Sequence, residues 1–134
     1  MATQDRIAPS LGWFKAETDL STTGQWLLAE LNATKGEVDL CDNAGDFPIG
    51  IIQNNPKAGE AVELGTAAGS VYKLTVDGNA GAIAIGDTLG TDAAGKGVKK
   101  SADAAWYCCI ALQASTAAGD IIPVLWVGLQ QRAS

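Results

Sequence analysis

The chain carries the segment Ile51-Ile-Gln-Asn-Asn-Pro-Lys-Ala-Gly-Glu60, which aligns without a gap on Ala111-Leu-Gln-Ala-Ser-Thr-Ala-Ala-Gly-Asp120 at an offset of 60 positions. The same offset extends the alignment to residues 38–64 and 98–124. A duplicated strand–loop–strand unit explains this repeat. Because alanine and glycine matches arise easily in this composition, coincidence explains it too.

The alignment bears on the structure of residues 102–113, which have a high helix propensity and contain no glycine. The first copy holds Pro48 and Gly50 at the positions that align with the middle of this stretch. A helix interior tolerates neither residue well. We therefore predict a strand from Trp106 to Leu112.

Short apolar runs bounded by turn residues recur along the rest of the chain. Runs of about four to eight residues rich in valine, isoleucine and aromatic side chains, separated by Gly, Asn, Asp and Pro, are typical of β-sandwiches and barrels. The predicted fold class is therefore all-β: a compact small β-barrel or sandwich of short antiparallel strands, with an extended N-terminal arm. One segment departs from this pattern, because Gln25–Leu31 has the propensity of a helix. The apolar runs are 47–53, 71–76, 82–85 and 121–127.

Two clusters of turn residues predict β-hairpins. Asp92-Ala-Ala-Gly95 separates residues 87–89 from residues 97–100, and Asn32-Ala-Thr-Lys-Gly36 precedes residues 37–40.

A glycine followed by an acidic residue comes before several of the expected strands, at Gly36, Gly59, Gly86 and Gly119. Glycine permits a sharp turn, and the acidic side chain can cap the backbone that follows it. The alternative, acidic catalysis, needs two carboxylates paired across a cleft, and the sequence shows no such pair.

Small residues dominate the composition, with 23 alanines and 16 glycines among 134 residues. A chain of this length is expected to form one domain. Only eight residues are aromatic, and four of these are tryptophans, so a few large side chains must fill much of the core. Part of the burial is therefore expected to come from partner subunits.

The formal net charge is −6, with nine basic against fifteen acidic residues. Because nucleic-acid affinity comes largely from cations that neutralise phosphates, we predict no nucleic-acid partner. No segment reaches the ~18 apolar residues that a membrane span needs, and the N-terminus lacks the pattern of a secretory signal. We therefore predict a soluble, unsecreted protein with no membrane partner.

The sequence contains no histidine, which is the commonest general base and the commonest metal ligand. Gly90-Thr-Asp-Ala-Ala-Gly-Lys-Gly97 matches the first seven positions of a phosphate-binding loop, but Gly97 lacks the hydroxyl that would hold magnesium. A hairpin turn explains this segment better. We predict no enzymatic activity, no catalytic residues, no cofactor and no metal site.

Three cysteines are present, with Cys41 alone and Cys108 next to Cys109. We predict three reduced, mostly buried thiols rather than a disulfide framework, with the adjacent pair pointing to opposite faces of a strand.

Two groups of residues are candidates for an interface. Lys96, Lys99 and Lys100 form the local basic cluster, either as a solvated edge strand or as a docking patch for an acidic partner. Trp13 and Phe14 belong to an N-terminal arm, where they either cover the floor of the barrel or anchor in another subunit. We predict the arm at residues 1–20, the β domain at 21–128 and a C-terminal tail at 129–134.

One set of features resembles a family of small tailed-bacteriophage capsid decoration, or cement, proteins. The resemblance runs from about residue 18 to residue 126, and its densest part is Pro48-Ile-Gly-Ile-Ile-Gln-Asn-Asn-Pro-Lys-Ala-Gly-Glu-Ala-Val62. The other matching motifs are Thr18-Asp-Leu-Ser21, Gly36-Glu-Val38, Ile85-Gly-Asp87, Asp92-Ala-Ala-Gly-Lys96, Ile110-Ala-Leu-Gln113 and Gly119-Asp-Ile-Ile122.

The resemblance implies a structural virion protein that is made in the bacterial host cytoplasm and sits on the outer surface of the capsid. It implies the phage major capsid protein and other copies of the chain, as a homotrimer, as partners. It implies that the protein stabilises the shell by clamping neighbouring capsid subunits, and it supplies no catalytic residues. The alternative is a capsid-attached head fibre or a carbohydrate- or receptor-binding β module, which exposed tryptophans would favour.

Overall fold

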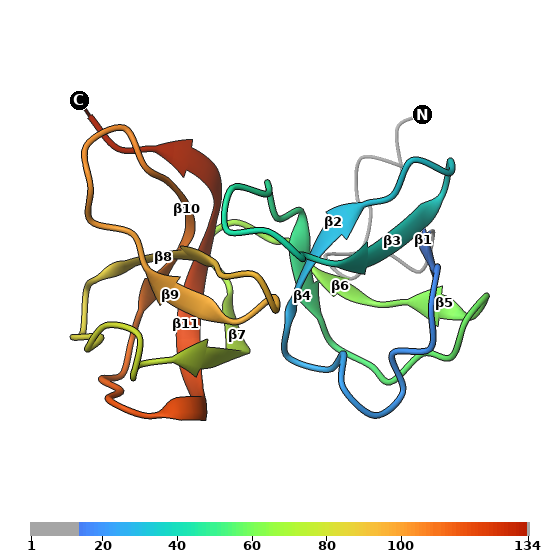
Figure 1. Cartoon of the computed structure of the whole chain (residues 1–134), viewed down its shortest axis with the longest axis horizontal. Helices are drawn as coiled ribbons and strands as arrows, with labels where there is room; N and C mark the ends of the chain where they lie inside the picture. The colour runs from blue at the N-terminus through green and yellow to red at the C-terminus, as the bar shows by residue number, and fades with distance from the viewer. Residues whose placement is uncertain (1–13, 134) are drawn as a thin grey trace.

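The computed structural model describes residues 14–133, and within them the chain forms eleven strands and no helix (Figure 1). The all-β prediction is confirmed. None of the described residues forms a helix long and apolar enough to cross a membrane. The strands are β1 (Phe14–Ala16), β2 (Leu28–Leu31), β3 (Glu37–Leu40), β4 (Gly50–Ile52), β5 (Ala61–Val62), β6 (Leu64–Gly65), β7 (Val71–Asp77), β8 (Thr88–Thr91), β9 (Gly97–Lys99), β10 (Trp106–Ala111) and β11 (Ala118–Gln131).

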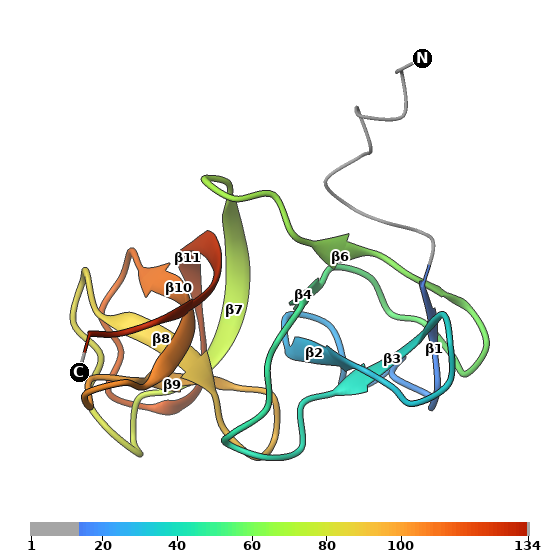
Figure 2. The same ribbon diagram turned by 90° about the horizontal axis from the view of Figure 1, so that it is seen from above.

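The strands build two lobes that lie side by side in both views (Figures 1 and 2). The first lobe, residues 14–65, is a six-stranded sheet in the order β5-β1-β3-β2-β4-β6. Only Glu63 separates β5 from β6, so one segment supplies both ends of this sheet. The barrel lobe, residues 71–131, is a closed barrel in the order β10-β11-β7-β9-β8.

The two lobes share one strand order. In the barrel lobe, β7, β8, β9 and β10 take the places of β1, β2, β3 and β4. The long strand β11 takes the places of both β5 and β6: it pairs with β7 as β5 pairs with β1, and with β10 as β6 pairs with β4. The pair Phe14–Val62 in the first lobe corresponds to Leu74–Ile122 in the barrel lobe, each position shifted by 60. In the other corresponding strand pairs, the residues that lie opposite each other in the two lobes are also related by a shift of 60 positions, to within one residue.

The predicted turns are present. β2 and β3 form an antiparallel hairpin, and so do β8 and β9, with residues 92–96 as the connection. The stretch that resembles a phosphate-binding loop is therefore a hairpin. Gly36, Gly59, Gly86 and Gly119 have φ between +81° and +92°, which confirms that the turns before acidic residues require glycine.

Two local expectations need correction. Residues 82–85 form no strand: Ile83 makes a single bridge to Ser115, and the Asp87 carboxylate accepts a hydrogen bond from the Ala84 N–H at 2.8 Å, which holds a turn there. The helical propensity of residues 25–31 is also misleading, because Trp26 has a φ of +67° and interrupts the segment before β2 begins. The strand predicted over 106–112 is confirmed as β10.

The adjacent cysteines do not point to opposite faces. A bulge between Tyr107 and Cys109 shifts the register of β10, and both Cys108 and Cys109 face the core, with their Sγ atoms 3.5 Å apart. Cys41 is buried as well, and all three thiols are free, as predicted. Burial raises the pKa of the Cys109 thiol well above its ordinary value, so this thiol stays protonated.

The hydrophobic core consists of two clusters. One lies inside the first lobe and contains Ala29, Val38, Val62 and Leu64. The other fills the barrel and includes Trp126, but it also takes up Leu28 from the first lobe. Because Leu28 is fully buried in the barrel cluster, the two lobes share a core rather than meeting at a wet surface.

Candidate functional site

The junction between the lobes brings together most of the chemically distinctive side chains. A hairpin tip from the barrel lobe reaches the first lobe, where Gly95 accepts a hydrogen bond from the Leu28 N–H at 2.8 Å. The loop of residues 42–47 lies against the barrel lobe in return, and its Ala44 carbonyl accepts a hydrogen bond from Lys100 Nζ at 3.1 Å. These reciprocal contacts fix the relative position of the lobes.

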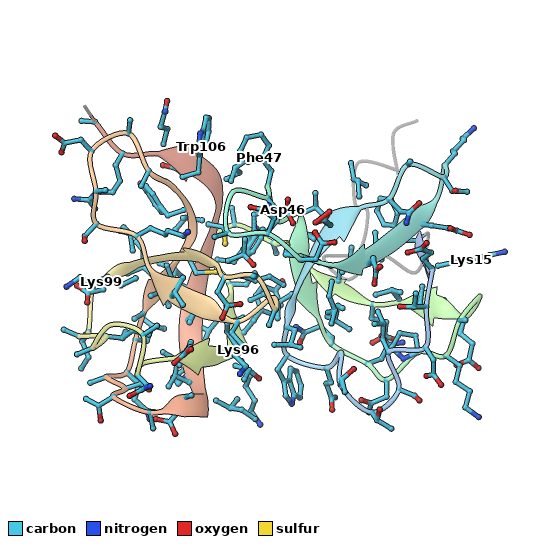
Figure 3. All side chains as sticks on the ribbon, viewed as in Figure 1. Lys15, Asp46, Phe47, Lys96, Lys99 and Trp106 are labelled. Carbon is cyan, nitrogen blue, oxygen red and sulfur yellow. The ribbon has the colours of Figure 1, made fainter. Side chains whose placement is uncertain are left out.

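An exposed aromatic pair, Phe47 and Trp106, bridges the lobes at one end of this junction (Figure 3). The ring centroids are 5.3 Å apart and the rings are tilted by 57°. Phe47 is 54 % exposed and Trp106 is 41 % exposed, which is unusual for side chains of this size. Sequence reasoning did not select this pair, because its members come from different lobes and carry no shared motif.

A cavity of about 530 Å³ opens at the junction. Its walls come from both lobes and are largely apolar, with the Lys96 and Asp42 side chains as the charged members. The lining residues include Leu27, Leu40, Cys41, Thr75, Ala93 and Ala94.

The three predicted interface lysines have separate contacts. Lys96 is half-buried and lines the cavity, whereas Lys99 is exposed and forms an ion pair with Asp87 at 3.4 Å. Lys100 is half-buried and holds the 42–47 loop through Ala44. The edge-strand interpretation is wrong, because β9 lies between β7 and β8 in a closed barrel.

The predicted aromatic residues of the arm lie at the limit of the described chain. Trp13 lies outside the described residues. Phe14 is the first residue of β1, is half-buried and packs against the core cluster of the first lobe. β1 thus begins inside the stretch expected as an arm, and β11 continues to Gln131, inside the stretch expected as a tail.

Two carboxyl groups and a thiol meet beneath the 42–47 loop. The ligand atoms of Glu30, Cys41 and Asp46 lie within 4.8 Å of one another. Burial is the main reason that the pKa of the Glu30 carboxyl is raised to about 7, and the neighbouring Asp46 raises it further. Hydrogen bonding to Glu30 lowers the pKa of Asp46. Burial raises the pKa of the Cys41 thiol to about 12. At neutral pH the thiol is protonated and Glu30 is partly so, and a cation that bound there would have to displace these protons.

We expect Glu30→Gln to stabilise the protein above neutral pH. The Glu30 carboxyl has an ordinary pKa of 4.5 and a folded-state value of about 7, so the folded chain holds an extra proton between these values. Stability from this group therefore falls as the pH rises through that window and is constant above it. The variant carries no such charge, and urea unfolding at pH 8 should show a gain of about 1–2 kcal/mol over the wild type, allowing for solvent screening.

At pH 4, below both values, the two proteins should have nearly equal stability. Glu63→Gln removes an exposed carboxylate and is the matched control, for which little change is expected at either pH. A Glu30→Gln variant that is less stable than the wild type at pH 8 would show that the charged carboxylate contributes favourably.

The junction gathers several features that suit contact with another macromolecule. What it offers a partner is an exposed aromatic pair, an apolar cavity and nearby charges, which are the components of a protein interface.

Comparisons with known proteins agree with this description. A family model described as phage cement protein matches residues 19–126. Among solved structures, the chain is similar to the N base of the head fiber gp8.5 of bacteriophage phi29, with a TM-score of 0.62 and 12 % sequence identity over 84 % of this chain and 89 % of that one. At this identity the likeness concerns the fold. No curated protein sequence matches the chain.

Proposed function

Because this chain belongs to the phage cement protein family and is thus a structural protein of the phage capsid, we propose that it binds the outer surface of the shell and clamps neighbouring major capsid protein subunits. We propose that it acts as a homotrimer and has no enzymatic activity. The observation that carries the proposal is the family match over residues 19–126, which spans both lobes.

The physical properties of the chain support a clamp. A clamp must transmit force between the two subunits that it holds, and the shared core around Leu28 makes the two lobes a single mechanical unit. An aromatic pair exposed at the junction supplies the kind of side chain that dominates binding energy. With many copies on a symmetric shell, small binding free energies at the individual sites would sum to a large stabilisation of the whole shell.

Capsids that lack the protein should bind the purified chain saturably and then survive heating better than bare capsids. The expected result follows from mass action, because a ligand that binds only the intact shell raises its stability. Binding is measured by co-sedimentation, and shell integrity by the temperature at which packaged DNA becomes accessible to a dye. Saturable binding with no rise in this temperature would contradict the stabilising role, and an absence of binding would contradict the proposal as a whole.

The exposed aromatic pair favours a second candidate, a head fibre or carbohydrate-binding module, since sugars stack on aromatic faces. The 57° tilt of the Phe47 ring against Trp106 argues against it, because the two rings do not form one flat platform. We expect a panel of glycans to leave the tryptophan fluorescence unchanged. Quenching that disappears in Trp106→Phe would favour the carbohydrate-binding function instead.

We also propose that the two lobes arose by duplication of one unit. The shared strand order supports this, and it includes β1 and β2 as well as residues 38–64. Trp26 and Gly86, which lie 60 positions apart, both have positive φ, and their N–H groups donate to Ile52 and Ala111, at 2.8 Å in each case.

We propose that a small set of residues contacts the capsid. Lys99 is exposed and Lys96 is half-buried, and both are proposed to meet an acidic partner. The further proposed contacts are Trp13, Phe14 and Lys100. Capsid contacts through these lysines should weaken with added salt.

A further inference from the structure

The 42–47 loop holds its shape through its own hydrogen bonds. The Asp46 carboxylate accepts from the N–H groups of Asp42 and Asn43, at 2.9 Å in each case. The Asn43 side chain accepts from the Gly45 N–H at 2.9 Å, and the Asn43 carbonyl accepts from the Asp46 N–H at 3.0 Å. The loop can therefore move as one piece about its two ends.

Both ends of the loop are fixed to β2. The N–H groups of Cys41 and Ile49, on either side of the loop, donate to carbonyl groups of β2 at 3.0 and 2.8 Å. Within the loop itself every residue is exposed except Asp46, which is half-buried. Asp46 is thus the inward-facing member of the loop.

The contact that Asp46 makes with β2 is a pair of carboxyl groups. One of its oxygens lies within 4.8 Å of an oxygen of Glu30. The Oε2 atom of Glu30 is buried and has no hydrogen-bond partner among the described residues. Because two adjacent carboxylates repel each other, this contact is favourable only while the pair holds a proton. The proton belongs to Glu30, since Asp46 is the carboxyl whose pKa is lowered.

The other titratable and charged groups around the pair come from both lobes. They are Asp39, Cys41 and Asp42 of the first lobe, and Lys100, Cys108 and Arg132 of the barrel lobe. Lys100 donates to the Ala44 carbonyl at 3.1 Å. Arg132 donates to the Thr88 hydroxyl at 3.0 Å. Loss of the Glu30 proton therefore places a carboxylate beside two aspartates, while both cations are bound to other groups.

We propose that this carboxyl pair is a pH-sensitive latch for the 42–47 loop: when Glu30 loses its proton, the loop moves away from β2 and separates Phe47 from Trp106. The loop is the part that moves, because β2 is held between β3 and β4. Phe47 moves with it, whereas Trp106 stays on β10 (Figure 3). The exposed aromatic pair is thus present only while the latch is closed. The proposal concerns the chain by itself and does not depend on capsid binding.

The direction of the pH dependence follows from the position of Glu30. Its carboxyl has an ordinary pKa of 4.5 and a value of about 7 in the closed state. Opening admits water and removes Asp46, which returns the pKa toward 4.5. Opening is therefore favoured progressively as the pH rises through this range, and it is independent of pH below it.

Hydrogen exchange of the 42–47 loop and alkylation of Cys41 by iodoacetamide measure the opening. The wild type is compared with Glu30→Gln at the same pH, so that the intrinsic pH dependence of both reactions cancels. At pH 8.5 the loop should exchange, and Cys41 should react, about tenfold faster in the wild type, which corresponds to relieving roughly one pH unit of the raised pKa. At pH 5.5 the two proteins should behave alike. Glu63→Gln, which alters an exposed carboxylate, is the matched control and should follow the wild type.

Two further measurements separate the latch from other causes. The faster exchange should not depend on urea below the unfolding transition, because local opening exposes little surface. Tryptophan emission should titrate with a midpoint near pH 7 in the wild type and not in Glu30→Gln. Phe47→Leu should remove this change in emission and leave the pH dependence of loop exchange in place.

Asp46→Asn is a second test, because its side chain can still accept from the loop N–H groups and its amide can donate to an ionised Glu30. This variant should keep the loop protected at pH 8.5. Equal loop exchange in the wild type and Glu30→Gln at pH 8.5 would overturn the proposal. So would faster exchange of the wild type at pH 5.5 by the same factor, or an Asp46→Asn loop that opens as the wild type does.

Discussion

Leu28→Ala should destabilise both lobes together, by about 2–5 kcal/mol in the free energy of unfolding. Leu28 belongs to β2 of the first lobe, yet its side chain is fully buried in the cluster that fills the barrel. Its N–H donates to Gly95 of the barrel hairpin, and its carbonyl accepts from Cys41 at 3.0 Å, so the backbone around it cannot move to fill the cavity left by the substitution. A cavity at that position weakens the packing that joins the lobes.

Leu64→Ala is the matched control, because Leu64 is equally buried but lies in the core cluster of the first lobe. Hydrogen exchange followed strand by strand distinguishes the two variants. Leu28→Ala should speed exchange in both lobes, whereas Leu64→Ala should act first on β1 to β6. If Leu28→Ala leaves the barrel strands as protected as in the wild type, the lobes are independent and do not form one mechanical unit.

Gly78→Ala should be the most damaging of the glycine-to-alanine changes in the turns. A Cβ atom at this position would lie 2.6 Å from the carbonyl carbon and oxygen of Ser115, and backbone atoms cannot move aside as the end of a side chain can. Gly78 is buried, and its N–H donates to Ala117 at 3.0 Å, which ties the end of β7 to the start of β11. We expect a loss of about 1–3 kcal/mol or more, measured by urea unfolding.

Gly81→Ala provides the comparison three residues further along. Nothing lies within 4 Å of a Cβ atom placed there, and its φ is not positive. This variant should be neutral or slightly stabilising, because alanine restricts the unfolded chain more than glycine does. Equal effects at the two positions would mean that the contact with Ser115 relaxes without cost.

The local structure was largely predictable because it depends on turn chemistry. The four glycines that precede an acidic residue and an expected strand, at 36, 59, 86 and 119, all have positive φ, and the hairpins at 32–36 and 92–96 follow from their turn residues. The repeat at an offset of 60 positions identified β10 as a strand where propensity favours a helix. The errors arose where tertiary contacts override such rules, as in the bulge that turns both Cys108 and Cys109 inward.

The arrangement of the surface was not predictable in the same way. Phe47 and Trp106 meet because a loop of one lobe crosses to the other, and no local pattern records a contact across 59 positions. Which outward residues of β7, β10 and β11 lie opposite one another depends on the register of these strands, which local patterns do not record. The lysines were visible in the sequence, but their separate contacts were not.

Comparing the structures of capsids with and without this protein tests most directly whether it clamps neighbouring capsid subunits. Electron cryomicroscopy of the phage particle, compared with a particle that lacks this chain, should show added density on the outer surface, into which the two lobes fit and which touches at least two neighbouring major capsid protein subunits. Density on the inner surface, at the tail, or on a single capsid subunit without a neighbour would contradict the clamp.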